Sequence, residues 1–148
     1  MLRMSSDRVN DDWESPRIDL TLRSIINQVA GFMYRTWGTD IEITCLLRTA
    51  AEDAALYHNP LHQPGVHVFG RGADLSVHEY SLSEVNSLVN HVNENWQYDP
   101  ARPMMLCAIY EDATHPDSSG AHIHLQSHLD THPIVHGDAP QDAEETAT

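Results

Sequence analysis

The stretch His67-Val68-Phe69-Gly70-Arg71-Gly72-Ala73-Asp74 organises the rest of this chain. Two glycines lie between the histidine and the aspartate, and glycine allows the backbone to turn sharply and to approach neighbouring groups closely. From residue 73 to residue 77, small or apolar residues alternate with polar ones, which predicts a short strand after the turn. We therefore expect the side chains of His67 and Asp74 to point toward the same place.

A second stretch offers a further histidine for this place. Residues 121–126 read Ala-His-Ile-His-Leu-Gln, and residues two apart in a strand face the same side. His122 and His124 should therefore point together, with the apolar residues between and after them in the core. A catalytic zinc ion takes three protein ligands and leaves one position open for water. The pattern predicts a Zn²⁺ site made by His67, Asp74 and His124; the alternative is a glycine-rich turn whose polar residues are solvated.

The two stretches together resemble the zinc site of the hedgehog/D,D-peptidase group. This chain carries HxxGxGxD at residues 67–74 and HxH at residues 122–124, where the group usually has SxHxxGxAxD and a final histidine. The group includes peptidase M15-type D,D-carboxypeptidases, L-alanyl-D-glutamate endopeptidases of phage lysins, penicillin-insensitive murein endopeptidases and the signalling domain of hedgehog proteins. Residues 43–49 are similar to the group's strand that ends in Arg-Thr, so the resemblance covers residues 20–128. Gly65 and Gly72 stand where the group has serine and alanine.

The resemblance implies a zinc-dependent peptidase that cleaves peptidoglycan stem peptides, as a D,D-carboxypeptidase or as an endopeptidase. A phage or prophage is one source that it suggests for the gene. Arg48 matches the arginine that faces the group's cleft, and a guanidinium can bind a carboxylate of the stem peptide by two hydrogen bonds. Without the resemblance, a surface ion pair would explain Arg48 equally well.

The catalytic base is where this sequence departs from most of the group. D,D-peptidases and many lysin endopeptidases have Glu or Asp three residues before the final histidine, and Ala121 occupies that position here. Related murein endopeptidases and hedgehog instead have a histidine two residues before the last ligand, which His122 matches. His122 would act as the base or as a donor to the developing oxyanion, unless it only supports the site. Glu111, Asp112 and Asp117 are further candidates for the base, or else solvated loop charges.

Two other functions remain open. A non-catalytic zinc-binding interaction domain of the same fold is favoured by the missing acidic base, whereas His122 and Arg48 favour the enzyme. An acidic structural or assembly protein with incidental histidines is the third possibility. The metal content of the purified protein separates the third function from the other two, and turnover of muropeptides separates the enzyme from the interaction domain.

Composition limits the partners and the location. The net charge of −14 argues against nucleic-acid binding, and no apolar run approaches the ~18–20 residues of a membrane helix. The first residues lack the apolar segment of a secretory signal, so we expect synthesis in the cytoplasm and action on the cell wall after release or virion delivery. We expect a monomer that binds peptidoglycan peptides. Cys45 and Cys107 are expected to be buried free thiols.

The pattern of the whole chain predicts one domain between two loose ends. Residues 1–14 should be a flexible arm, residues 15–128 the zinc peptidase-like domain, and residues 129–148 a disordered acidic tail. The expected class is α+β, a small antiparallel sheet with helices packed on one side, as in the hedgehog/D,D-peptidase fold. Helical spacing and caps predict helices at 15–38, 49–57 and 81–96, and apolar patterning predicts strands at 41–47, 73–77, 104–110 and 121–126.

Overall fold

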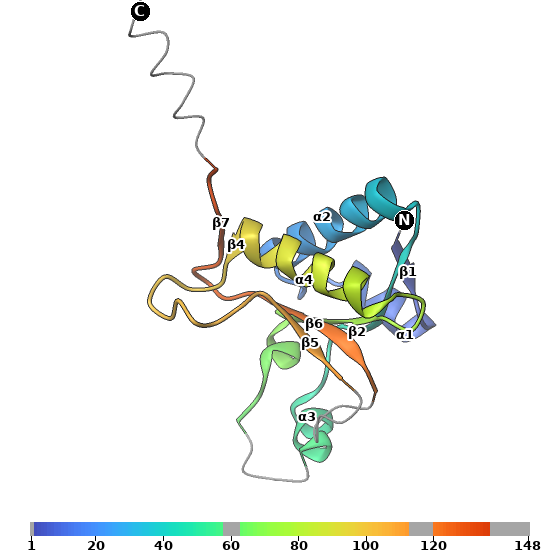
Figure 1. The fold of residues 1–148 in the computed structure, drawn as a ribbon. Helices are drawn as coiled ribbons and strands as arrows, with labels where there is room; N and C mark the ends of the chain where they lie inside the picture. Colours follow the sequence, from blue (N-terminus) through green and yellow to red (C-terminus); the bar gives the residue numbers. More distant parts are fainter. Residues whose placement is uncertain (1, 58–62, 113–119, 137–148) are drawn as a thin grey trace, which may run out of the picture.

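The computed structural model describes residues 2–57, 63–112 and 120–136. Four helices and a five-stranded sheet make up most of this part, so the α+β class is confirmed (Figure 1). In chain order the elements are β1 (Leu2–Met4), α1 (Asp7–Glu14), α2 (Leu20–Trp37), β2 (Ile41–Cys45), α3 (Ala50–Leu56), the 3-10 helix η1 (Val66–Phe69), β3 (Gly72–Ser76), α4 (Leu82–Asn95), β4 (Trp96–Gln97), β5 (Ala108–Glu111), β6 (His122–Gln126) and β7 (His132–Pro133).

The main sheet has the strand order β1-β2-β3-β6-β5 and is mixed rather than antiparallel throughout. Strands β2, β3, β6 and β5 pair antiparallel, whereas β1 pairs parallel with β2. The two central strands set the register of the site, because Asp74 lies opposite His124 and Ser76 lies opposite His122. Residues directly opposite in antiparallel strands have Cβ atoms only ~4.5–5.5 Å apart, so this pairing alone brings Asp74 and His124 into contact range.

Helices α2 and α4 cover one face of the sheet, and α3 lies on the other side (Figure 1). The predicted packing of helices on one side therefore holds for the two long helices. Their apolar faces and the inward residues of the strands form one core, to which β6 contributes the fully buried Ile123 and Leu125. Because side chains alternate along a strand, His122 and His124 lie on the opposite face of β6 from that core.

Local signals explain most helix ends. Helix α2 begins later than predicted: Ser15 ends α1, and Asp19 caps α2 by accepting a hydrogen bond from the Leu22 amide. Gly38 ends α2 in the left-handed conformation, as its position suggested. The capping box from Ser81 to Glu84 is present at the start of α4, as predicted.

The first residues differ from the expected flexible arm, because they form β1 and α1. Val9 of α1 is buried in the core. Arg8 binds the carboxylate of Glu52 in α3 with both terminal nitrogens, at 2.6 and 2.8 Å, and donates to the Leu47 carbonyl. These contacts are made with residues about forty positions away, so local composition did not reveal them.

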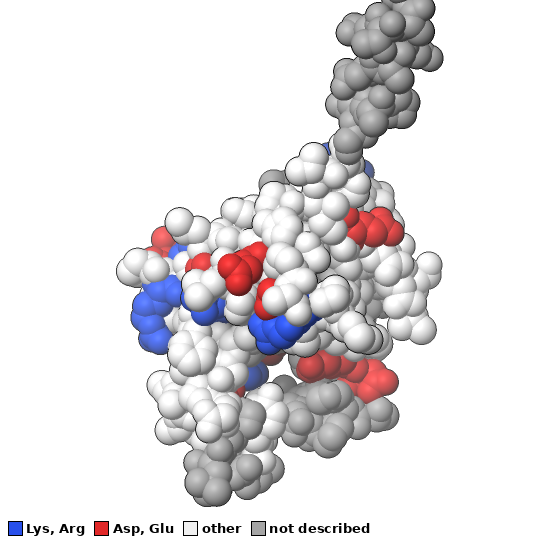
Figure 2. Space-filling model, turned by 90° about the vertical axis from the view of Figure 1, so that its left-hand side faces the viewer, with Lys and Arg blue, Asp and Glu red and all other residues white. Residues whose placement is uncertain are grey.

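The predicted tail is described only up to residue 136, and residues 137–148 lie outside the described residues. Its first part includes β7, which pairs with β4, and the buried Thr131. The predicted strand at 104–110 is shorter than expected, since β5 begins at Ala108. Among the described residues, no helix is long and apolar enough to cross a membrane. On the face in Figure 2, acidic and basic side chains are interspersed without a continuous basic surface.

Candidate metal centre

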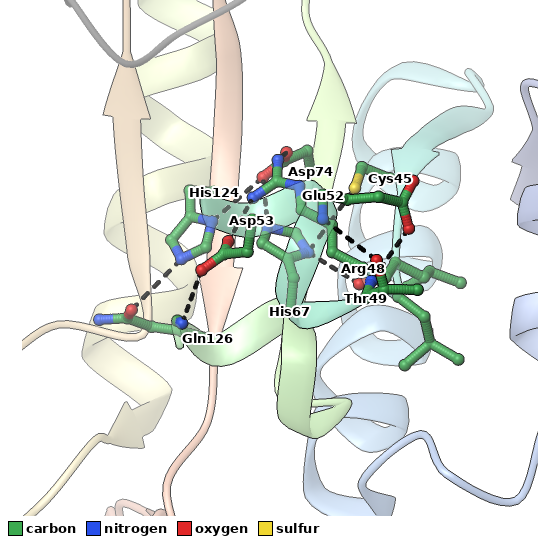
Figure 3. Close-up of polar contacts among 12 residues, drawn as sticks. Cys45, Arg48, Thr49, Glu52, Asp53, His67, Asp74, His124 and Gln126 are labelled. Carbon is green, nitrogen blue, oxygen red and sulfur yellow. Dashed lines mark hydrogen bonds and ion pairs between the residues drawn. The ribbon is translucent and has the colours of Figure 1, made fainter. Parts of the chain in front are cut away.

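The structure brings the five predicted site residues into one cleft. Its volume is about 350 Å³, and Arg48, His67, Asp74, His122 and His124 all line it. Arg48 follows β2, His67 lies in η1, Asp74 lies in β3, and the last two histidines lie in β6. The side chains of His67, Asp74 and His124 point toward one another (Figure 3).

The glycines of the central stretch make this arrangement possible. Gly70 has φ of +70°, and a Cβ at this position would overlap the carbonyl oxygen of Arg17. A Cβ on Gly72 would lie 2.7 Å from Cγ2 of Val66 and 3.1 Å from the ring of His67. Only glycine therefore lets β3 start so close behind η1, which places Asp74 beside His67.

One carboxylate oxygen is the point of convergence. Oδ1 of Asp74 lies 3.3 Å from Nε2 of His67, 3.1 Å from Nδ1 of His124 and 3.6 Å from Nε2 of His122. Ligand atoms at ~2.0–2.1 Å from a tetrahedral zinc ion are themselves about 3.3 Å apart. Nε2 of His67 and Nδ1 of His124 are therefore each close enough to Oδ1 of Asp74 to share an ion with it, while the ligand atoms that all lie within 4.8 Å of one another are those of Cys45, His67 and Asp74.

His67 is held in the tautomer that a metal ligand needs. Its Nδ1 lies 2.8 Å from the carbonyl oxygen of Leu46. A carbonyl can only accept, so Nδ1 carries a proton, and Nε2, which faces Asp74, is the nitrogen that a metal could bind in place of a proton. Metal-binding histidines usually donate their other N–H group to a carbonyl or carboxylate in this way.

His124 is oriented by a residue that the sequence analysis missed. Nε2 of His124 lies 3.2 Å from Oε1 of Gln126, and the amide nitrogen of Gln126 donates to the Leu106 carbonyl at 2.8 Å. The second bond fixes which end of the amide faces His124, so Nε2 is the donor and Nδ1, which faces Asp74 at 3.1 Å, is the nitrogen that a metal could bind. Gln126 lies two residues after His124 on the same strand face, and strand periodicity was the signal that could have found it.

Charge at this site favours a bound cation. Burial opposes the charged form of His67, but its bond to Asp74 outweighs that effect and raises its pKa to about 10. Burial likewise opposes ionisation of Asp74, yet contacts with His124 and His67 hold its pKa well below the usual range. The buried carboxylate therefore stays negative and draws a positive partner, which a metal ion would supply in place of the imidazole proton.

Arg48 contacts the other oxygen of the same carboxylate. Its guanidinium lies 3.4 Å from Oδ2 of Asp74 and 3.6 Å from Oδ1 of Asp53. Asp53 is buried, and its second oxygen accepts from the Gly65 amide at 2.9 Å. Arg48 thus lies at the wall of the cleft rather than in a surface ion pair. Asp53 was missed because a helix position gives no sign of the distant amide that it binds.

His122 and Glu111 form a pair beside this centre. Nδ1 of His122 lies 2.8 Å from the Gly120 carbonyl, and Nε2 lies 2.9 Å from Oε2 of Glu111. Glu111 is in β5, directly opposite His122 in the strand register, and it lines the cleft. Of the other predicted carboxylates, Asp112 does not line the cleft, and Asp117 lies outside the described residues.

Cys45 lies beside His67, near the ring nitrogen that does not face Asp74. Ligand atoms of Cys45, His67 and Asp74 all lie within 4.8 Å of one another, so these residues could hold a metal ion. The sulfur, however, lies 3.8 Å from Nδ1 of His67, the nitrogen already bonded to the Leu46 carbonyl. Cys45 and Cys107 are both free thiols, as predicted, but only Cys107 is fully buried, and burial raises its pKa to about 12.

A second candidate metal group lies elsewhere. Ligand atoms of Asp99, His128 and Asp130 also lie within 4.8 Å of one another. Here Nδ1 of His128 accepts from the Asp130 amide at 3.2 Å, and Asp99 binds Arg102 at 2.8 Å. Both would have to give up these bonds to a metal. The described part of the chain thus has two groups compatible with a metal, of which the one at Asp74 is better prepared.

Relatives give no independent guide to this site. Comparisons with family models, with curated proteins and with solved structures returned no match.

Proposed function

We propose that this protein is a zinc-dependent peptidase of the hedgehog/D,D-peptidase type that cleaves peptidoglycan stem peptides. The observation that carries the proposal is the paired orientation of His67 and His124. Each ring donates its outer N–H group to a fixed acceptor and points its other nitrogen at Oδ1 of the buried Asp74. Zinc suits two imidazoles and one carboxylate, and three protein ligands leave one position open.

His67, Asp74 and His124 would hold the ion, which when bound polarises a carbonyl and lowers the pKa of its water toward ~7. Arg48, about a fifth of whose side chain is exposed, would bind a carboxylate of the substrate with the N–H groups that face the cleft. His122, beside the same Asp74 oxygen, would take or give a proton during the reaction.

The walls of the cleft fit a short peptide. Arg48 supplies a positive charge for a terminal or side-chain carboxylate of such a peptide, while Leu56, Met105 and Ile109 supply apolar surface for its methyl groups. With its net charge of −14, the chain lacks the electrostatics for nucleic acid. Small peptides with both a carboxylate and apolar side chains are the substrates that this lining favours.

A second candidate function is a non-catalytic zinc-binding interaction domain of the same fold. Two observations favour it: Ala121 cannot take a proton, and His122 brings a third imidazole nitrogen to within 3.6 Å of Oδ1 of Asp74. A fourth protein ligand would close the coordination sphere, as in structural zinc sites.

Digestion of purified peptidoglycan, with mass analysis of the products, tests the proposal. We expect the zinc-loaded protein to release defined muropeptides, a chelator to abolish release, and added zinc to restore it. His124→Ala serves as the matched inactive control. A zinc-loaded protein that releases nothing from several peptidoglycan types would reject the peptidase and favour the interaction domain.

A further inference from the structure

We propose that Glu111 is the general base of this site, in place of the acidic residue that Ala121 does not supply. The inference rests on the proposed peptidase function and deepens it. An acidic residue three positions before the last histidine would reach the cleft along the same strand. In this chain the carboxylate comes instead from the neighbouring strand β5.

Strand pairing places Glu111 beside the metal centre. Glu111 lies opposite His122 in the register of β5 and β6, and its Oε2 is 2.9 Å from Nε2 of His122. The same nitrogen lies 3.6 Å from Oδ1 of Asp74. One imidazole nitrogen therefore touches both the carboxylate that would hold the metal and the carboxylate of Glu111. A water in the part of the cleft lined by Glu111 and His122 could give its proton to Glu111, directly or through one further water.

The other carboxylates that line the cleft are held in ion pairs with Arg48. Among the described residues that line it, the acidic ones are Asp53, Asp74 and Glu111. Asp53 is buried between Arg48 and the Gly65 amide, and Asp74 lies between Arg48 and the histidines. Glu111 keeps about a quarter of its side chain exposed, so water can reach it.

The proposed reaction balances without any further reactant. The oxygen of a water molecule forms a bond to the peptide carbonyl carbon, the carbonyl π electrons move to the carbonyl oxygen, and the water proton passes to Glu111. The C–N bond then breaks, its electron pair goes to nitrogen, and Glu111 returns the proton to that nitrogen. The products are a carboxylic acid and an amine. His122 holds the carboxylate in place through Nε2 while its Nδ1 is anchored on the Gly120 carbonyl.

The Glu111→Gln variant tests whether Glu111 takes a proton during the reaction or only positions His122. The glutamine amide can still form a hydrogen bond with Nε2 of His122, as donor or as acceptor, but cannot take a proton at neutral pH. With the zinc-loaded full chain and a muropeptide that the wild type cleaves, we expect kcat to fall roughly 10²–10⁴-fold, the range for general acid–base groups. KM and the zinc affinity measured by chelator competition should stay within about threefold of wild type, the latter because Glu111 is no ligand.

Two further variants act as controls. Asp112→Asn changes the next carboxylate, which does not line the cleft, and should leave kcat within about twofold of wild type. Glu111→Asp keeps a basic carboxylate on a shorter side chain, so its kcat should lie between those of wild type and Glu111→Gln.

Each outcome decides one point. A Glu111→Gln variant that keeps kcat within about tenfold would show that Glu111 only positions His122, which overturns this inference and leaves the peptidase intact. Loss of zinc from the same variant would make Glu111 a ligand and would also overturn it. A wild type that holds zinc but cleaves no muropeptide would overturn the proposed function and this inference with it.

Discussion

The Asp74 cluster (His67, Asp74 and His124) and the Asp99 cluster (Asp99, His128 and Asp130) offer similar ligand atoms to a metal. The hydrogen bonds within the two clusters differ. Ligand atoms of Asp99, His128 and Asp130 lie within 4.8 Å of one another, as do those of Cys45, His67 and Asp74, and His124 joins the second set through Asp74. At Asp74, the outer nitrogens of His67 and His124 bind fixed acceptors, and the inner nitrogens face an oxygen. At Asp99, the histidine nitrogen nearest the carboxylates already accepts an amide proton.

The difference shows that composition and proximity do not make a metal site. A ligand atom must have a free lone pair directed at the ion, and its other polar atom must be bonded so that this direction is fixed. At Asp74, the outer bonds of His67 and His124 fix the direction of the inner nitrogens, which a metal would bind in place of a proton. The hydrogen bonds of the Asp99 cluster hold neighbouring loop segments together instead. Asp99 accepts from the Ala101 amide and from Arg102, and Thr131 donates to the Tyr98 carbonyl. Each of the following variants breaks or sharpens this comparison.

Loss of a ligand should have the largest effect. His124→Ala removes a ligand nitrogen from the Asp74 cluster and should abolish turnover. Zinc binding should weaken by more than about 100-fold, which exceeds the effect of losing a residue that only hydrogen-bonds to a ligand. His128→Ala, in the Asp99 cluster, is the matched variant and should keep one zinc ion per chain. The measurement is zinc content after dialysis, by atomic emission. Equal zinc loss in both variants would remove the distinction between the clusters.

Replacement of His122 should separate chemistry from metal binding. His122→Ala leaves the three proposed ligands in place, so zinc should stay bound, while turnover of muropeptides should fall roughly 10²–10⁴-fold. Steady-state kinetics on zinc-loaded protein provide the measurement. An unchanged rate would leave proton transfer to Glu111 without help from His122, and loss of the metal would make His122 a fourth ligand.

Gln126 tests the role of the outer bonds. Gln126→Met keeps the length of the side chain but removes the acceptor for Nε2 of His124, so zinc affinity should fall roughly 10–100-fold. Chelator competition gives the affinity, and a far-ultraviolet spectrum controls for folding. A wild-type affinity in this variant would mean that the His124 tautomer is set without Gln126.

The smallest effect is expected at the Asp99 cluster and concerns stability. The pKa of Asp99 is lowered mainly by its bond to Arg102 and next by its bond to the Ala101 amide. The ionised carboxylate therefore stabilises the folded chain at pH values above the usual pKa of an aspartate, and this stabilisation is lost as the pH falls below that value. Asp99→Asn should therefore lower Tm slightly at pH 7 and hardly at pH 3, without changing zinc content. Thermal unfolding followed by circular dichroism at both pH values measures this. A Tm difference that grows toward low pH would contradict the assignment.

Local signals in the sequence predicted much of the site. The glycine-rich turn before Asp74 and the alternation through His122 and His124 act over a few residues, so they could be read without knowing the fold. The same signals predicted the core stripe of α2 and the capping box of α4. The structure then brings the predicted site residues together, while their roles and the identity of the metal stay predictions.

What the sequence did not reveal depends on contacts between distant segments. Residues 1–14 have little apolar periodicity, yet α1 is held by Val9 in the core and by Arg8 on Glu52. Glu111 looked like a loop charge because the register between β5 and β6 cannot be read from either strand alone. The parallel pairing of β1 with β2, which makes the sheet mixed, was missed for the same reason.

Anomalous diffraction at the zinc absorption edge, from crystals grown with one equivalent of zinc, tests the central claim most directly. The account predicts a single strong peak between Nε2 of His67, Oδ1 of Asp74 and Nδ1 of His124, with distances of ~2.0–2.2 Å to each. A peak at Asp99, His128 and Asp130, or no peak at Asp74, would contradict it.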